Sequence, residues 1–191
     1  MFFVVLQVAG WITALGWAAR ATYLKGSRSF RTDFGLQWER FDIFRGIVTG
    51  FGTLILIAIV VAALGANVGD PTISELEPDG AFQVLLFGFA LVVGAPIVEE
   101  IFFRGLFLRA AERRFGTFGA VVFVTTVFTV LHVPQRMELG FVLAFVPIFT
   151  IGLLFALLAV RYRRLGPGIA AHMTFNGIAF LALIASQNGA T

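Results

Sequence analysis

The stretch from residue 98 to 105 carries three charged side chains inside a run that is otherwise apolar: Glu99, Glu100 and Arg104. A charge at the centre of a bilayer costs about 2.5–3.5 kcal/mol on insertion scales, so such groups need partners or water. Ionisable residues inside membrane spans commonly mark a functional site. The sequence therefore predicts a membrane helix whose charged residues meet polar partners from elsewhere in the chain.

The composition of the whole chain also indicates a membrane protein. Of its 191 residues, 59% are hydrophobic and 13% are charged, and the mean hydropathy is +0.93. Soluble domains usually contain roughly 25% charged residues, so this chain is too apolar to be one. We expect an all-α fold, a polytopic bundle of about six transmembrane helices with the lipid bilayer as a partner.

Two features of the composition exclude classes of function. The chain has no cysteine, which excludes disulfides, cysteine-based zinc sites, a cysteine nucleophile and S-acylation. Its pI of about 10.2 could indicate a nucleic-acid partner. However, the arginines lie beside apolar spans, so contact with anionic lipid and control of topology explain them better. We expect no nucleic-acid partner.

Apolar stretches define the expected spans, at residues 2–19, 46–65, 81–95, 117–133, 141–160 and 169–187. Gly46 and Gly50 in the second stretch permit close helix contact. Gly94-Ala95-Pro96 predicts a kink or a helix restart, because proline cannot donate a helical hydrogen bond. The helix then continues through the two glutamates to Arg113-Arg114, and Phe115-Gly116-Thr117 is typical of a turn.

The loops between these spans set the expected topology. The basic loops are residues 20–45, 104–114 and 161–164. They alternate along the chain with an acidic loop at 66–80 and a short polar loop at 134–140. The positive-inside rule places the basic loops in the cytoplasm of a multi-pass cell-membrane protein, and the small size favours a prokaryotic one. We expect residues 1–80 to form two N-terminal helices and residues 81–191 a catalytic core of about four, within one membrane domain.

A hairpin at Phe115-Gly116 would bring two polar side chains to the same level. Glu99 lies 16 residues before Phe115, and His132 lies 16 residues after Gly116. At 1.5 Å per residue each lies about 24 Å from the turn, so an antiparallel pair of helices sets them side by side. Phe128 sits one helical turn from His132 on the same face.

The last span adds His172 and Asn176, which lie one turn apart on one helix face. Measured from Gly168, they lie only about 6 and 12 Å along the span. They reach the level of Glu99 only if residues 104–114 project well beyond the membrane, which the amphipathic character of that segment permits.

The residue types in this set suit acid–base chemistry. Both histidines of the chain belong to it, and a histidine near carboxylates suits proton transfer, an oxyanion contact or metal binding. Paired glutamates push each other's pKa apart, so one can act as a base toward water. Arg104 lies four residues after Glu100 and is expected to neutralise it, which leaves Glu99 for catalysis.

Together these motifs resemble the CAAX-protease and bacteriocin-processing family of intramembrane proteases, which includes the Ras-converting endopeptidase of eukaryotes. The resemblance covers residues 96–176 and rests on three motifs in order: Glu99-Glu100-x-x-x-Arg104, Phe128-x-x-x-His132 and His172-x-x-x-Asn176. It implies an endopeptidase that cleaves a membrane-associated peptide, which in the eukaryotic relatives is a prenylated C-terminal CAAX sequence.

The resemblance also implies roles for single residues. Glu99, of the pair Glu99-Glu100, would activate water, and His132 would hold that water or pass protons. His172 and Asn176 would stabilise the oxyanion, with Arg104 and Phe128 in support. Ligand chemistry favours a mechanism without a metal cofactor. Zinc is the alternative, with the three ligands Glu99, His132 and His172.

Other interpretations remain open at this point. Glu100 and Arg104 could form an ion pair that only fixes helix position, Asn176 could be an interhelical hydrogen-bonding residue, and Phe128 could be packing. The protein could be a non-catalytic scaffold or a bacteriocin self-immunity protein, in which immunity would survive Glu99→Gln. A proton or metal transporter ranks third, because the chain has no internal repeat and a single polar cluster.

Overall fold

The computed structural model describes residues 2–66 and 80–188, without the side chains of residues 2–6, 135, 187 and 188. This part of the chain folds into helices and contains no strand, as predicted. The elements are α1 (Phe2–Lys25), α2 (Phe30–Asp33), α3 (Asp42–Ala63), α4 (Ala81–Phe89), η1 (Ala90–Gly94), α5 (Ala95–Glu99), η2 (Glu100–Phe107), α6 (Leu108–His132), η3 (Val133–Leu139), α7 (Phe141–Tyr162) and α8 (Gly166–Asn188).

Four helical stretches are long and apolar enough to cross a membrane: Asp42–Ala63, Ala81–His132, Phe141–Tyr162 and Gly166–Ser186. The second has 52 residues and leaves helical geometry at Gly116, so it contains both spans expected at 81–95 and 117–133. The multi-pass membrane bundle is therefore confirmed. The first expected span, 2–19, lies in α1 and stays a prediction, because the side chains at its start are outside the described residues.

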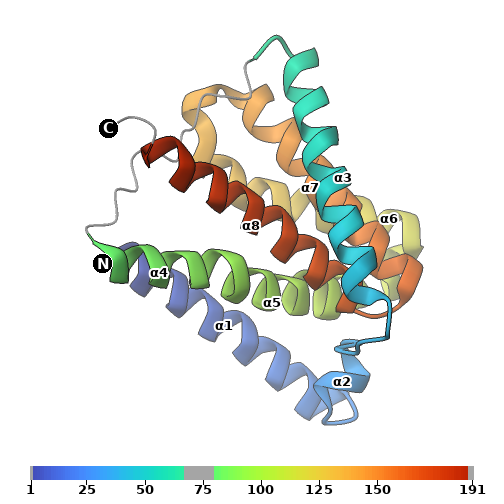
Figure 1. Ribbon diagram of the computed structural model, residues 1–191. Coiled ribbons are helices and arrows are strands. Elements are labelled where there is room, and N and C mark those ends of the chain that lie inside the picture. Colours follow the sequence, from blue (N-terminus) through green and yellow to red (C-terminus); the bar gives the residue numbers. More distant parts are fainter. Residues whose placement is uncertain (1, 67–79, 189–191) are drawn as a thin grey trace.

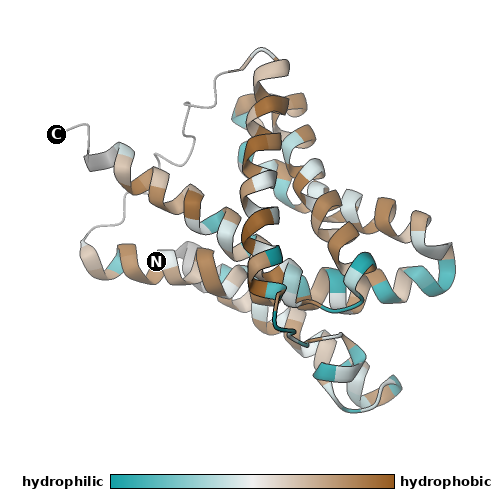
Figure 2. Ribbon diagram, turned by 45° about the vertical axis from the view of Figure 1, so that its right-hand side comes forward, coloured by the Kyte–Doolittle hydropathy of each residue, from teal (hydrophilic) through white to brown (hydrophobic). Residues whose placement is uncertain are grey.

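The helices pack as crossing layers (Figure 1). α1 runs beside the α4–α5 segment, α8 packs on the other side of that segment, and α3 crosses α8 and α7. Figure 2 shows that the long helices are mainly hydrophobic, while hydrophilic residues gather at the lower right of that view. The polar loop expected at 134–140 is instead a short 3-10 helix, η3. The acidic loop expected at 66–80 lies almost wholly outside the described residues.

The turn at Phe115-Gly116 is confirmed, and it closes an antiparallel hairpin. Gly116 adopts φ 69° and ψ 173°, a conformation that glycine reaches without steric cost. Aromatic rings then pair across the hairpin at positions almost equidistant from the turn. The ring centres of Phe103 and Phe128 are 5.2 Å apart, and those of Phe107 and Phe123 are 5.6 Å apart. This register brings Glu99 level with His132.

The kink or restart expected at Gly94-Ala95-Pro96 takes another form. The chain keeps helical geometry through Gly94 (φ −63°, ψ −56°), and the preceding η1 is a π-helical turn. The longer hydrogen-bond spacing of a π turn lets Pro96 enter the first turn of α5 without interrupting the helix. A second π-helical stretch, η2, begins at Glu100. Such stretches are frequent at functional sites.

Small residues let α3 and α8 approach each other closely. A Cβ added at Gly46 would lie 2.2 Å from the Cβ of Ala170, and one at Gly50 would lie 2.7 Å from the Cβ of Thr174. The first residue of α3 then holds the turn that precedes α8. Asp42, which is fully buried, accepts two hydrogen bonds of 2.8 Å from Arg164. These contacts fix the helix that carries His172.

We expect Gly46→Ala to lower the free energy of unfolding by about 1–3 kcal/mol, because the new methyl group overlaps Ala170. Gly52→Ala is the matched control in the same helix, since a Cβ at Gly52 meets nothing within 4 Å. That variant should gain roughly 0.5–1 kcal/mol from helix propensity. Unfolding of both variants in one detergent measures the difference, and equal stability would contradict the close α3–α8 contact.

Candidate active site

Glu99 lies at the meeting point of three helices. Its Oε2 is 3.8 Å from Nε2 of His132 and 3.9 Å from Nε2 of His172. Glu99 comes from the end of α5, and the histidines come from the end of α6 and the first turns of α8. The structure thus brings together the three residues that the sequence placed at the centre of the site. The Glu99 side chain is 17% exposed, so a small molecule can reach it.

His132 is oriented by its own helix. Its Nδ1 lies 2.7 Å from the carbonyl oxygen of Phe128, and its ring stacks on the Phe128 ring at 4.2 Å. A carbonyl oxygen only accepts hydrogen bonds, so Nδ1 carries the hydrogen and donates it. The neutral ring therefore presents the lone pair of Nε2 toward Glu99.

His172 is oriented by the second glutamate. Its Nδ1 donates to Oε1 of Glu100 at 3.2 Å, which leaves Nε2 facing Glu99. The imidazole is 6% exposed and lies 5.0 Å from the ring of Phe155. Thus Glu99 lies nearest to Nε2 of this histidine, and Glu100 lies nearest to its Nδ1.

The predicted ion pair between Glu100 and Arg104 is present, at 3.1 Å, with both side chains fully buried. Arg104 also donates to the carbonyl oxygen of Gly152 on α7 at 3.2 Å, and its guanidinium lies 4.6 Å from the centre of the Phe128 ring. Oε1 of Glu100 thus contacts Arg104 and, at 3.2 Å, Nδ1 of His172, and a catalytic role for Glu100 stays a prediction.

Asn176 makes an interhelical hydrogen bond, as one interpretation of the sequence allowed, with a partner that the sequence did not identify. Its Nδ2 donates to the carbonyl oxygen of Leu91 in η1 at 2.8 Å, which links α8 to the π-helical turn before Glu99. The Gly152 carbonyl and the Phe155 ring were also missed as parts of the site. A backbone acceptor carries no signal in residue type, and with 23 phenylalanines no single one stands out.

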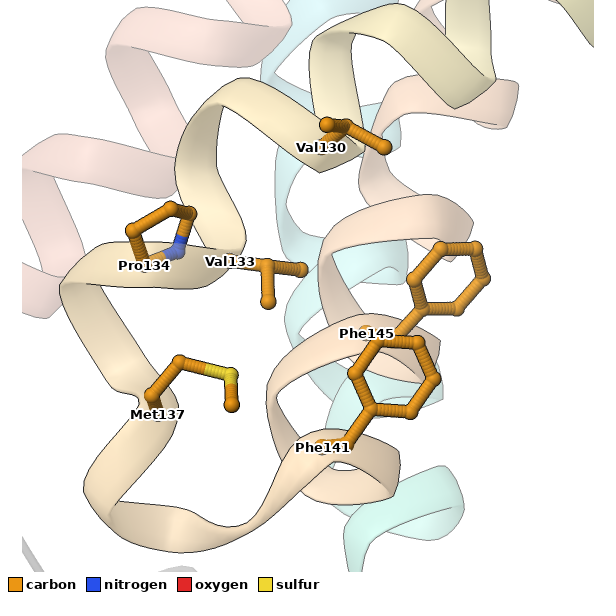
Figure 3. Close-up of a pocket in the computed structure, with 6 residues that line it drawn as sticks. All are labelled: Val130, Val133, Pro134, Met137, Phe141 and Phe145. Atoms are coloured by element: carbon orange, nitrogen blue, oxygen red, sulfur yellow. The ribbon is translucent and has the colours of Figure 1, made fainter.

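An apolar groove opens beside His132 (Figure 3). It has a volume of about 400 Å³ and lies between the end of α6, η3 and the start of α7. Its lining residues are Val130, Val133, Pro134, Met137, Phe141 and Phe145. Val133 directly follows His132 in the chain, so the groove lies at the end of α6 that carries His132.

Zinc would need Glu99, His132 and His172 as ligands, and their nitrogen and oxygen donors are of the type that zinc accepts. Yet within residues 2–66 and 80–188 no group of three or more His, Cys, Asp or Glu side chains is arranged to hold a metal ion. We therefore derive no step through a metal.

A comparison with protein-family models gives one match, described as "Type II CAAX prenyl endopeptidase Rce1-like", over residues 81–178. The matched region runs from the start of α4 into α8. It includes every residue of the cluster described above, and it agrees with the resemblance drawn from the three motifs. No curated protein and no solved structure matches the chain.

Proposed function

The chain belongs to the Rce1-like family of type II CAAX prenyl endopeptidases, and we propose from this that it is an intramembrane endopeptidase in which Glu99 activates water. The observation that carries the proposal is the convergence of two histidine Nε2 atoms on one Glu99 oxygen, at 3.8 and 3.9 Å. Both distances exceed those of a direct hydrogen bond, so a water can bridge the three groups.

In this mechanism Glu99 removes a proton from the water as its oxygen attacks the scissile carbonyl carbon. The water donates its other hydrogen to Nε2 of His132, which is available because Nδ1 is engaged by the Phe128 carbonyl. In the form that carries a hydrogen on Nε2, His172 would donate to the oxyanion that forms, while its Nδ1 stays in contact with Glu100. Collapse of the tetrahedral intermediate breaks the C–N bond, and protonated Glu99 returns its proton to the leaving amine.

We assign Asn176 a second oxyanion contact from the Nδ2 hydrogen that Leu91 does not use. The groove beside His132 supports a substrate that carries a large apolar group near the scissile bond. A prenylated C-terminal peptide is one such substrate. We place the protein in the cytoplasmic membrane of a prokaryote, with the basic loops 20–45, 104–114 and 161–164 in the cytoplasm.

The direct test is cleavage of a fluorogenic farnesylated CAAX peptide by the purified protein in detergent. We expect cleavage by the parent protein and a loss of roughly 10²-fold or more in His132→Ala, because the water loses a positioning partner. Thermal unfolding of both proteins should be measured alongside, since a variant that fails to fold is uninformative about catalysis.

A second arm adds a zinc chelator. Cleavage that continues in its presence supports the metal-free mechanism, whereas a loss that added zinc reverses would overturn that part of the proposal. If the parent protein cuts neither this peptide nor its unprenylated counterpart, the endopeptidase assignment fails. The scaffold or self-immunity alternative then becomes the better explanation.

A further inference from the structure

A cleft at the turn of the hairpin has a net positive charge, because its lining contains more arginines than acidic residues. It has a volume of about 510 Å³ and lies where the helix that begins at Ala81 reverses. Its lining residues are Arg109, Glu112, Arg113, Gly116, Thr117 and Arg163. Arg109 is ten residues from Glu99 along the helix, about 15 Å, so this cleft is separate from the candidate active site.

The hydrogen bonds of the cleft leave Arg109 and Arg113 without a carboxylate in direct contact, and Glu112 and Asp33 attract Arg109 only at longer range. Glu112 accepts two bonds from Arg163, at 2.8 and 2.9 Å, and so neutralises that arginine. Arg109 donates to the carbonyl oxygens of Asp33 and Arg163, at 3.2 and 2.9 Å, and these neutral acceptors fix its guanidinium without cancelling its charge. Arg113 is exposed and has no hydrogen-bond or ion-pair partner among the described residues.

The turn beside the cleft exposes large aromatic side chains. Phe118 is 84% exposed and Phe115 is 50% exposed, on either side of Gly116. Exposed phenylalanine next to arginine suits the boundary of a bilayer, where the rings enter the acyl region and the guanidinium groups stay at headgroup depth. These exposed side chains fit a cleft at the level of the lipid headgroups.

We propose that this cleft binds the phosphate of an anionic phospholipid headgroup through Arg109 and Arg113. Guanidinium groups match phosphate oxygens with paired hydrogen bonds, and Arg109 is already held in position by two backbone carbonyls. The assignment is independent of the proposed peptidase activity.

Native mass spectrometry of the protein in detergent, with dioleoylphosphatidylglycerol or dioleoylphosphatidylcholine added, tests the proposal. The parent protein should retain phosphatidylglycerol more strongly than phosphatidylcholine. Arg113→Gln should weaken phosphatidylglycerol binding about fivefold, which corresponds to about 1 kcal/mol for one arginine near a membrane surface. Arg113 supports no other contact in the described part of the chain, so this variant should fold normally.

Arg114→Gln is the matched control, because it removes the same charge from the neighbouring residue, which does not line the cleft. It should retain the parent's binding. Equal weakening by the two variants would overturn the proposal in favour of a diffuse basic surface, and so would equal retention of the two lipids. Inorganic phosphate is the third arm: it should not displace phosphatidylglycerol, and displacement would overturn the lipid assignment in favour of free phosphate.

Discussion

Replacing Glu99 by glutamine is expected to lower peptide cleavage by roughly 10²–10⁴-fold, the range for loss of a general base. Glutamine has nearly the same shape but cannot take a proton from water. Both histidine contacts converge on this one carboxylate oxygen, so no neighbouring group is placed to replace it. We do not expect Glu100 to substitute, because its Oε1 is held by Arg104 and His172 and its side chain is fully buried. The initial rate on the farnesylated peptide measures the loss.

The matched control for this variant is Glu138→Gln, which changes an exposed glutamate in η3 and should leave the rate unchanged. Thermal unfolding should show that Glu99→Gln is folded, since the side chain keeps its size. If Glu99→Gln cleaves as fast as the parent protein, Glu99 is not the base and the mechanism is wrong. The family assignment would survive that result.

The hairpin shows why part of the site could be predicted from the sequence. Counting residues from Phe115-Gly116 fixes which side chains become level, because the rise per residue of a helix is constant. The ring pair Phe103–Phe128 and the pair Glu99–His132 lie where this count places them. Periodicity and residue type carried all the information that was needed.

The level of His172 depended on how far residues 104–114 project. The sequence required them to project well beyond the membrane, and the structure shows how far they pass the start of the last span. Arg109 donates to the carbonyl oxygen of Arg163 at 2.9 Å, so the turn between α7 and α8 lies level with the middle of that segment. The rest of the segment extends beyond this turn and forms the basic cleft. The same projection thus sets the depth of His172 and creates the proposed lipid site.

Other contacts could not have been predicted. Asn176 meets the carbonyl oxygen of Leu91, and Arg104 meets that of Gly152. Both acceptors are backbone atoms, which every residue type supplies, so the sequence does not distinguish them. The carbonyl of Leu91 lies in the π-helical turn η1 and that of Gly152 in α7, and both contacts depend on packing between helices far apart in the chain.

Replacing Arg104 by methionine is expected to lower the free energy of unfolding by about 3–5 kcal/mol, the usual cost of removing one partner from a buried ion pair. Methionine keeps an unbranched apolar side chain but leaves the Glu100 carboxylate without its cation. It also removes the donor to the Gly152 carbonyl, a contact that joins η2 to α7. Unfolding in detergent measures the change, and Arg113→Met, at an exposed residue, is the control.

The double variant Arg104→Met, Glu100→Gln separates a structural ion pair from a catalytic one. Its glutamine carries no charge, so a large part of the lost stability should return, and its amide oxygen can still accept from Nδ1 of His172. If cleavage returns with stability, the pair only positions the helices and the histidine. If stability returns while cleavage stays low, the charge of Glu100 is needed for the reaction itself. A loss well below 1 kcal/mol in the single variant would contradict the buried ion pair itself.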